Sequence, residues 1–129
     1  MRKIVLAVWT ACLLFCLSSQ LMAKVWVIEI KVLEEPKGNF FIDMGEKYAY
    51  AVPPGDIIKW TCDFPFEVNF DLKTPFETMS ISPNAIEKKL DAKAPHLQMY
   101  KYTVNVPKDK TRAANLTLDP VIIVKPPKS

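Results

Sequence analysis

The chain has 129 residues, and its 17 lysine and arginine residues against 14 aspartate and glutamate residues give a formal net charge of +3. A length of this order fits one domain, and so small a positive excess argues against nucleic acid as a partner. With only 3 glycines, the chain has no Gly-rich loop that could hold a phosphate.

The N-terminal segment has the composition of a signal peptide. Arg2 and Lys3 are positive, Ile4 to Leu17 is apolar apart from one threonine, and the small residue Ala23 follows a short polar stretch. These features predict a signal peptide over residues 1–23 and therefore a secreted or periplasmic protein. An apolar run of about 14 residues is short for a bilayer, which needs roughly 20. An uncleaved membrane anchor is the alternative, and it would be the only contact with a membrane.

Removal of this segment leaves about 106 of the 129 residues, which we interpret as a domain over residues 24–125 and a loose tail over 126–129. Without Arg2 and Lys3, 15 basic residues stand against 14 acidic ones. Two of the three cysteines would also be lost, so Cys62 cannot form an internal disulfide. The domain must therefore be stabilised by its hydrophobic core.

The first half of the domain predicts short strands. Apolar and polar residues alternate from Val25 to Leu33, which is typical of a half-buried strand, and the proline and glycine within Glu34 to Asn39 predict a turn. A short strand is expected from Phe40 to Met44. Gly45 then predicts a bulge or bend before the pattern resumes at Tyr48.

Tyr48 to Phe70 predicts a strand, a tight turn and two further strands. Aromatic and β-branched residues alternate with alanine up to Val52, and Pro53 to Asp56 then form the turn. Ile57 to Trp60 restarts a strand. Phe66 to Phe70 alternates again, with Pro65 at its start, where a missing amide donor is tolerated.

This stretch resembles the first half of the cupredoxin pattern, as found in plastocyanin-like domains. The resemblance rests on Pro-Gly-Asp at 54–56, Ile-x-Trp at 58–60 and Phe-Pro-x-x-Val-x-Phe at 64–70. In that family a histidine after the proline is the first copper ligand, and a cysteine, a histidine and usually a methionine follow between the last two strands. Phe66 stands where this histidine would be, and residues 100–124 contain no Cys, His or Met. The resemblance therefore implies the fold without the copper chemistry.

The middle of the chain has weaker signals. Residues 71–78 are expected to form a loop and residues 79–81 a short strand. Ser82-Pro83 resembles a helix start, and Ile86 and Leu90 would lie on one face of the short helix that follows. An irregular excursion is the alternative.

The last part predicts two strands. Met99 to Val106 alternates strongly, Pro107 to Asn115 is a polar loop, and Leu116 to Val124 is the final strand. Pro120 within that strand predicts an edge position or a bulge. Six or seven short strands with turn signals predict an all-β, Greek-key sandwich or barrel, in agreement with the cupredoxin resemblance. An immunoglobulin-like sandwich is the alternative.

Four residues are the candidates for metal or nucleophile chemistry, namely Cys62, His96, Met79 and Met99. Cys62 could act as a nucleophile or soft ligand only with a base or other ligands nearby, and we expect a small buried side chain instead. The single histidine, His96, could join Met99, and Met79 or Cys62, in a copper(I) site. We expect a surface histidine and core methionines instead.

The acidic and aromatic residues of the central stretch also have structural interpretations. Its acids are expected to be solvated or to bond turns, and they are Asp56, Asp63, Glu67 and Asp71. Its phenylalanines would cluster around the kink, with Phe66 filling the interior, and they are Phe64, Phe66, Phe70 and Phe76. Asn115-Leu116-Thr117 matches a glycosylation sequon.

The sequence therefore predicts an exported, non-catalytic binding or structural domain. We identify no catalytic, cofactor-binding or metal-binding residues and expect no cofactor. The expected partner is another protein or a cell-envelope component, bound through a loop end or an exposed strand edge. The alternative is an envelope metal-handling protein with a non-blue copper site formed by Met, His and Cys.

Overall fold

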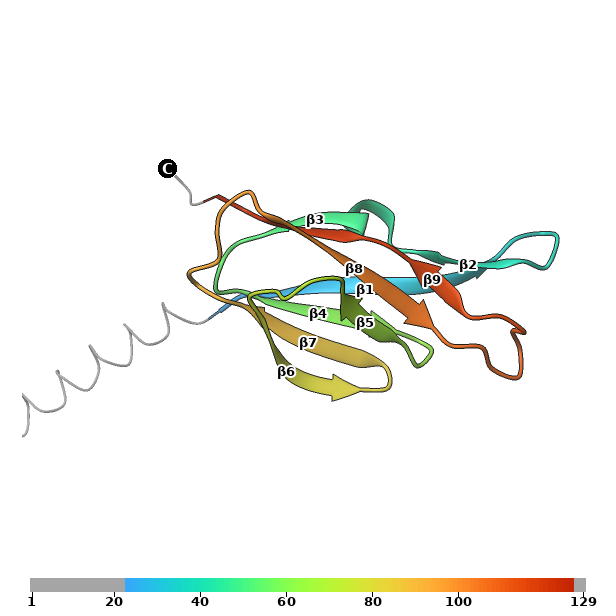
Figure 1. Cartoon of the computed structure of the whole chain (residues 1–129). Helices are drawn as coiled ribbons and strands as arrows, with labels where there is room; N and C mark the ends of the chain where they lie inside the picture. The colour runs from blue at the N-terminus through green and yellow to red at the C-terminus, as the bar shows by residue number, and fades with distance from the viewer. Residues whose placement is uncertain (1–22, 127–129) are drawn as a thin grey trace, which may run out of the picture.

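The computed structural model describes residues 23–126 and forms a β-sandwich of ten strands (Figure 1). The strands, in chain order, are β1 (Val25–Glu34), β2 (Phe40–Asp43), β3 (Ala49–Val52), β4 (Ile57–Cys62), β5 (Glu67–Phe70), β6 (Phe76–Ser82), β7 (Ala85–Leu90), β8 (Met99–Val106), β9 (Leu116–Leu118) and β10 (Val121–Val124). The only helical element within the described residues is a 3-10 turn, η1 (Gly45–Tyr48). The expected signal segment lies outside the described residues apart from Ala23, as do the last three residues of the tail.

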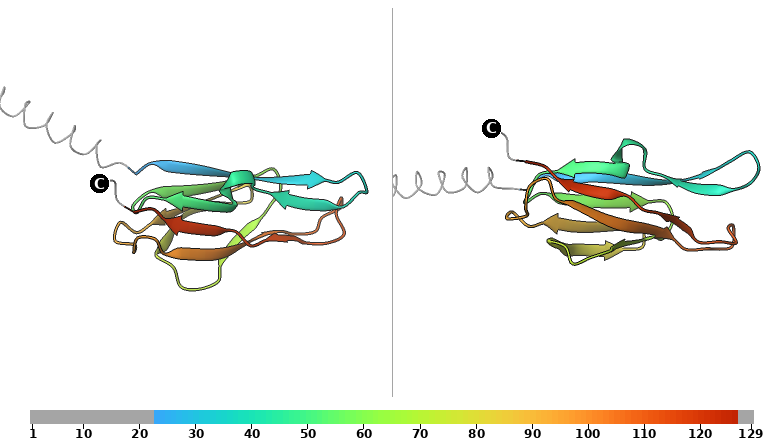
Figure 2. Two further views of the ribbon diagram at one scale, coloured as in Figure 1. Left: turned by 90° about the horizontal axis from the view of Figure 1, so that it is seen from above. Right: turned by 45° about the horizontal axis from the view of Figure 1, so that its top comes forward.

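The strands form two mixed sheets. The first sheet has the order β2-β1-β4-β7-β6, and the second has the order β3-β10-β8-β5, with β9 also paired to β8. Each sheet contains one parallel pair, β1 with β4 in the first and β3 with β10 in the second. Figure 2 shows the two layers from two further directions. The prediction of an all-β sandwich is therefore confirmed.

The core lies between the sheets because alternate side chains of each strand point inward. In β4 these inward residues are Ile58, Trp60 and Cys62. The indole nitrogen of the fully buried Trp60 donates a hydrogen bond of 3.2 Å to the hydroxyl of Tyr102 in the facing sheet. Since each polar atom would be costly to bury alone, this bond joins the two sheets at a fixed position.

Gly45 lies where the chain changes sheets. It has a positive φ of 59°, and its amide donates to the Asp43 carboxylate at 2.8 Å. The chain leaves β2 in the first sheet, passes through η1 and enters β3 in the second. The bend predicted at Gly45 is thus the crossing between the layers.

The helix predicted after Ser82 is wrong, since β6 and β7 form an antiparallel hairpin here. Ile86 and Leu90 are four positions apart, and that spacing puts two residues on one side of a strand as well as of a helix. The turn is held by the Ser82 hydroxyl, which donates to the Ala85 carbonyl at 3.1 Å. β6 also begins at Phe76, inside the segment predicted to be a loop.

Pro120 separates β9 from β10 but causes no bulge. Leu118 pairs with Val104 and Val121 pairs with Lys101, so the register to β8 is the same on both sides of the proline. The amide of Tyr102 donates to the Pro120 carbonyl at 3.0 Å, whereas proline has no amide to donate in return. Of the two predicted alternatives, an edge position and a bulge, the bulge is therefore wrong, and the sheet loses one hydrogen bond instead.

The sandwich has two distinct ends. The connections β1–β2, β4–β5, β6–β7 and β8–β9 lie together at the right in Figure 1, and we call this the loop end. The connections β3–β4, β5–β6 and β7–β8 lie at the left, with the start of β1 and the end of β10, and we call this the termini end. These two ends decide which residues can act together.

Candidate functional site

Arg112 is the one charged residue that is buried among those described, with 4% of its surface exposed. It belongs to the β8–β9 connection and crosses the loop end toward the β4–β5 kink. Its guanidinium carbon lies 4.4 Å from the ring centroid of Phe64 and 6.0 Å from that of Phe40. The cation is therefore placed on aromatic faces, an arrangement that favours a partly desolvated arginine.

The guanidinium of Arg112 is only partly hydrogen-bonded. Its Nη2 lies 3.1 Å from Oδ2 of Asp109 and donates to the Pro107 carbonyl at 3.3 Å. Nε and Nη1 are buried and have no hydrogen-bond partner among the described residues. Of the five N–H groups of arginine, one on Nε and two on Nη1 are thus unused. Such buried donors are costly unless another group accepts from them.

Asp109 organises the loop that carries Arg112. Its Oδ1 accepts hydrogen bonds from the amide and hydroxyl of Thr111, at 2.7 and 2.6 Å, and from the amide of Arg112 at 3.1 Å. The bonds from Thr111, with a smaller contribution from the Arg112 charge, lower the pKa of Asp109. The Asn115 side chain accepts from the Lys108 amide at 2.8 Å and closes the loop. The loop therefore holds Arg112 by local bonds.

An open groove of about 480 Å³ lies beside Arg112. The tip of the β1–β2 hairpin contributes residues 38–40 to it, and the β8–β9 loop contributes residues 111–114 and Leu116. Most of these side chains are small or apolar. The groove is thus lined by apolar side chains and by a cation whose hydrogen-bond donors are only partly used.

Cys62 lies near Arg112 at the end of β4, and it is buried as expected from the alternation of its strand. Burial raises the pKa of its thiol, and the charge of Asp63 adds to this, while the Phe64 amide and Arg112 act in the opposite direction. The thiol is therefore protonated at neutral pH. Because the nucleophilic form of cysteine is the thiolate, this environment does not activate it.

The four phenylalanines do not form one cluster. Phe66 is buried at the loop end, where its amide donates to the Pro83 carbonyl at 3.3 Å. Phe70 and Phe76 stack on each other 4.8 Å apart, next to Tyr102 and Tyr100, whereas Phe64 contacts Arg112. Phe66 thus fills the interior as expected.

The structure does not bring Cys62, His96 and Met99 together. Cys62 pairs with Ile30 and bonds the β6–β7 turn at the loop end. His96 lies at the termini end, where its Nδ1 is 3.3 Å from the Lys125 carbonyl oxygen, and Met99 begins β8 at the same end. Met79 and Met99 are more than half exposed, so the expectation that they fill the core is wrong. Within residues 23–126, no three His, Cys, Asp or Glu side chains are grouped as metal ligands would be.

The acidic residues of the central stretch do not pair with one another. Asp56 accepts from the indole of Trp26 at 2.9 Å and from the Lys24 amide at 3.2 Å, so it ties the β3–β4 turn to β1. The other three acids of this stretch, Asp63, Glu67 and Asp71, are exposed. These positions match the predicted solvated and turn-bonding roles.

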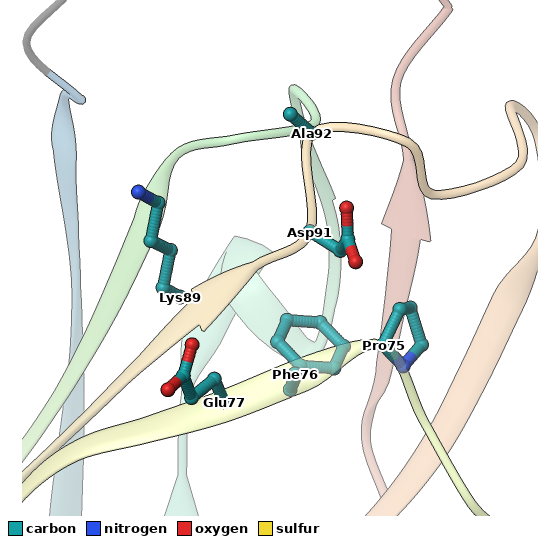
Figure 3. Close-up of a pocket in the computed structure, with 6 residues that line it drawn as sticks. All are labelled: Pro75, Phe76, Glu77, Lys89, Asp91 and Ala92. Atoms are coloured by element: carbon teal, nitrogen blue, oxygen red, sulfur yellow. The ribbon is translucent and has the colours of Figure 1, made fainter.

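A second open groove, of about 500 Å³, lies at the termini end between the start of β6 and the end of β7 (Figure 3). Its two acids, Glu77 and Asp91, direct their carboxylates away from each other. Asp91 accepts instead from the amide of Lys93 at 2.8 Å. This groove therefore does not present a facing pair of carboxylates for acid–base catalysis.

The outer edge of β6 is the other notable surface. β6 pairs only with β7 within the described residues and forms one edge of the first sheet. Met79 and Ile81 on this strand are 52% and 72% exposed. The pairing with β7 shifts between Thr78 and Ser80, which marks a bulge around Met79. Exposed edges of this kind can pair with a strand of another chain.

Comparison with known protein families and with curated proteins gives no significant match for this chain. In the part of the chain that the structure describes, no helix is long and apolar enough to span a bilayer.

Sequence reasoning missed Arg112 and its groove. The segment from Pro107 to Asn115 was predicted only as a polar loop, and nothing in its spacing indicates that an arginine would be buried. A partial signal was present, since aspartate followed two positions later by threonine is typical of a side chain that bonds its own turn. That signal predicts an ordered loop but not the stacking on Phe64.

Proposed function

We propose that this chain is an exported, non-catalytic binding domain with a cupredoxin-like arrangement and no copper site. The family resemblance is supported by the order of the Pro-Gly-Asp turn, the strand with buried Trp60 and the strand that follows Pro65. Phe66, at the position of the first copper ligand, is a buried apolar side chain at the same end as the β8–β9 loop. The Greek-key connection pattern and export are parts of this proposal.

The partner binds at the edge of β6, and the observation that carries this proposal is the exposure of Met79 and Ile81 on an unpaired strand edge. The strand has seven residues, contains no proline and carries one charge, that of Glu77. Natural proteins commonly protect such edges with charges or prolines. Ile81 is unusual in this respect, because a large apolar side chain projects where a charged residue would be protective.

The occupant that suits this edge is an extended segment of another protein. Its backbone would continue the first sheet by hydrogen bonding to β6, and its apolar side chains would cover Met79 and Ile81. Backbone pairing gives affinity, and the two exposed side chains give preference for an apolar strand. An active site is not required for this role.

The metal-handling alternative has no comparable support. In the form that includes Cys62, it requires Cys62 near His96 and Met99, but Cys62 lies at the loop end and the other two at the termini end. We therefore do not adopt it as the proposed function.

The binding proposal is tested by site-specific photo-crosslinking in the envelope of the native host. A photo-crosslinking amino acid replaces Ser80 on β6 or, as the control, the exposed Thr117 on β9. We expect a discrete crosslinked product only from position 80, and we expect Ile81→Lys to abolish it. Because Ile81 is exposed, Ile81→Lys should change the free energy of unfolding by less than about 0.5 kcal/mol.

Two results would contradict the proposal. One is the absence of any crosslink from position 80 while the chain is folded and present. The other is an equal product from positions 80 and 117, which would show contact without a preferred edge.

A further inference from the structure

We propose that the groove beside Arg112 is a binding site for a carboxylate group. This site is separate from the β6 edge and does not depend on the proposed function. Arg112 is 4% exposed, and its Nε and Nη1 donors lack partners among the described residues, while the same side chain lines an open groove of about 480 Å³. Buried polar atoms in folded proteins nearly always have partners, so these donors indicate an acceptor that enters from outside.

The local charge favours an anion. The β8–β9 loop carries Lys108, Lys110 and Arg112 against the single carboxylate of Asp109. Asp109 Oδ1 is already used by Thr111 and Arg112 amides, and only Oδ2 faces the guanidinium, at Nη2. Asp109 therefore positions one side of the guanidinium and leaves Nη1 for a second acceptor.

A carboxylate suits this groove better than a phosphate. Arg112 is the only buried cation within residues 23–126, and Asp109 already balances part of its charge. A phosphate dianion would place two negative charges against this one buried guanidinium, because Lys108 and Lys110 are exposed to solvent. A carboxylate carries one charge, and the apolar lining from Phe40, Ala114 and Leu116 can cover the carbon chain attached to it.

Access to Arg112 requires a small movement at the hairpin tip. Phe40 faces the guanidinium from β2, the first strand position after the β1–β2 turn. This hairpin extends beyond the rest of the sandwich, at the far right of Figure 1. We infer that displacement of the Phe40 ring, which lines the groove 6.0 Å from the guanidinium carbon, gives access to the buried donors. This movement need not disturb the β8–β9 loop, because that loop is held by Asp109 and Asn115.

The test is an NMR titration of ¹⁵N-labelled protein purified from cells that express the full chain. The resonance of the Arg112 Nε–H group is followed while acetate, succinate or inorganic phosphate is added. Four short peptides are also titrated. Two have a free C-terminal carboxylate, one with and one without an aspartate side chain, and the other two are the C-terminally amidated forms of these. These arms separate a terminal carboxylate, a side-chain carboxylate and a free acid as sources.

We expect a saturable shift of the Arg112 signal with carboxylates, and a weaker or absent shift with phosphate. Arg112→Lys should weaken binding by about tenfold or more, because lysine keeps the charge but loses the planar set of donors. Ala114→Trp, at an exposed position on the groove wall, should fill the groove and abolish binding while the fold stays intact. This variant tests the site even if Arg112→Lys does not fold. Lys93→Gln at the termini end is the matched control and should bind normally.

Three results would overturn the proposal. No shift with any carboxylate would mean that water alone fills the space beside Arg112. Equal binding of phosphate and carboxylate would make the loop a general anion site. Unchanged binding in Ala114→Trp would place the carboxylate elsewhere.

Discussion

Cys62 shows how its surroundings set the chemistry of a single residue. Burial raises the pKa of its thiol above the ordinary value of 9.0, and the nearby Asp63 acts in the same direction. The folded protein therefore holds this proton more strongly than the unfolded chain does. The resulting stabilisation is fully present below about pH 9 and is lost as the pH rises through the folded-state pKa.

We predict that the free energy of unfolding falls above pH 9 partly because of Cys62. Urea unfolding curves of the wild type and of Cys62→Ala should be compared between pH 7 and pH 10.5. The wild type should lose more stability over the alkaline part of this range, so the two curves of stability against pH should converge. Buried Tyr102, whose pKa is also raised by burial, contributes a further loss in both proteins at higher pH.

A surface variant, Thr117→Ala, provides the control for this measurement. Its curve should remain parallel to that of the wild type at every pH. If the curve of Cys62→Ala were also parallel, the thiol would not be the group that titrates.

The β3–β4 turn shows what one glycine contributes to an element. Gly55 has a positive φ of 87°, and its amide donates to the Leu90 carbonyl at 2.8 Å. A Cβ atom at this position would meet Ala92 at 3.6 Å, which is an ordinary contact. The cost of a side chain at Gly55 is therefore conformational rather than steric.

We predict that Gly55→Ala lowers the free energy of unfolding by about 1–2 kcal/mol, measured by urea denaturation. Gly38→Ala is the matched control, since Gly38 has a φ of 86° and no atom would lie within 4 Å of its new Cβ. Similar losses in both variants would confirm the backbone origin. A variant of Gly55 as stable as the wild type would show that the turn can adopt another conformation.

At the scale of the whole molecule, the separation of the loop end from the termini end determines whether Cys62 can share a metal ion with His96 and Met99. β4 carries Cys62 to the loop end, whereas the β7–β8 connection leaves His96 at the termini end. The ligands of one ion must lie at bonding distance from it, so a site formed jointly by Cys62, His96 and Met99 would require a different fold.

We predict that native mass spectrometry shows no stoichiometric binding of copper(I), copper(II) or zinc under reducing conditions. After metal addition, the variants Cys62→Ala and His96→Ala, like the wild type, should show only the peak of the metal-free protein. If the wild type bound one copper ion and both variants failed to bind it, the result would contradict this prediction and support the metal-handling alternative.

The sequence by itself determined most of the strands, the main turns and the burial of alternate side chains, but not β7 or the first part of β6. Those features depend on residues that are neighbours in the chain, as in the alternation up to Phe70 or the turn around Gly55. Local sequence patterns therefore predict them. The segment of β7 is predicted as a helix because Ile86 and Leu90 have a spacing that a strand and a helix share.

Only the tertiary structure decided which distant residues meet. The pairing of β1 with β4 and of β3 with β10, the stacking of Arg112 on Phe64 and the separation of Cys62 from His96 all depend on how the two sheets are connected. Such contacts arise from packing between segments far apart in the chain, and no local pattern encodes them. The candidate carboxylate site therefore became visible only when the β8–β9 loop was seen against the β1–β2 hairpin.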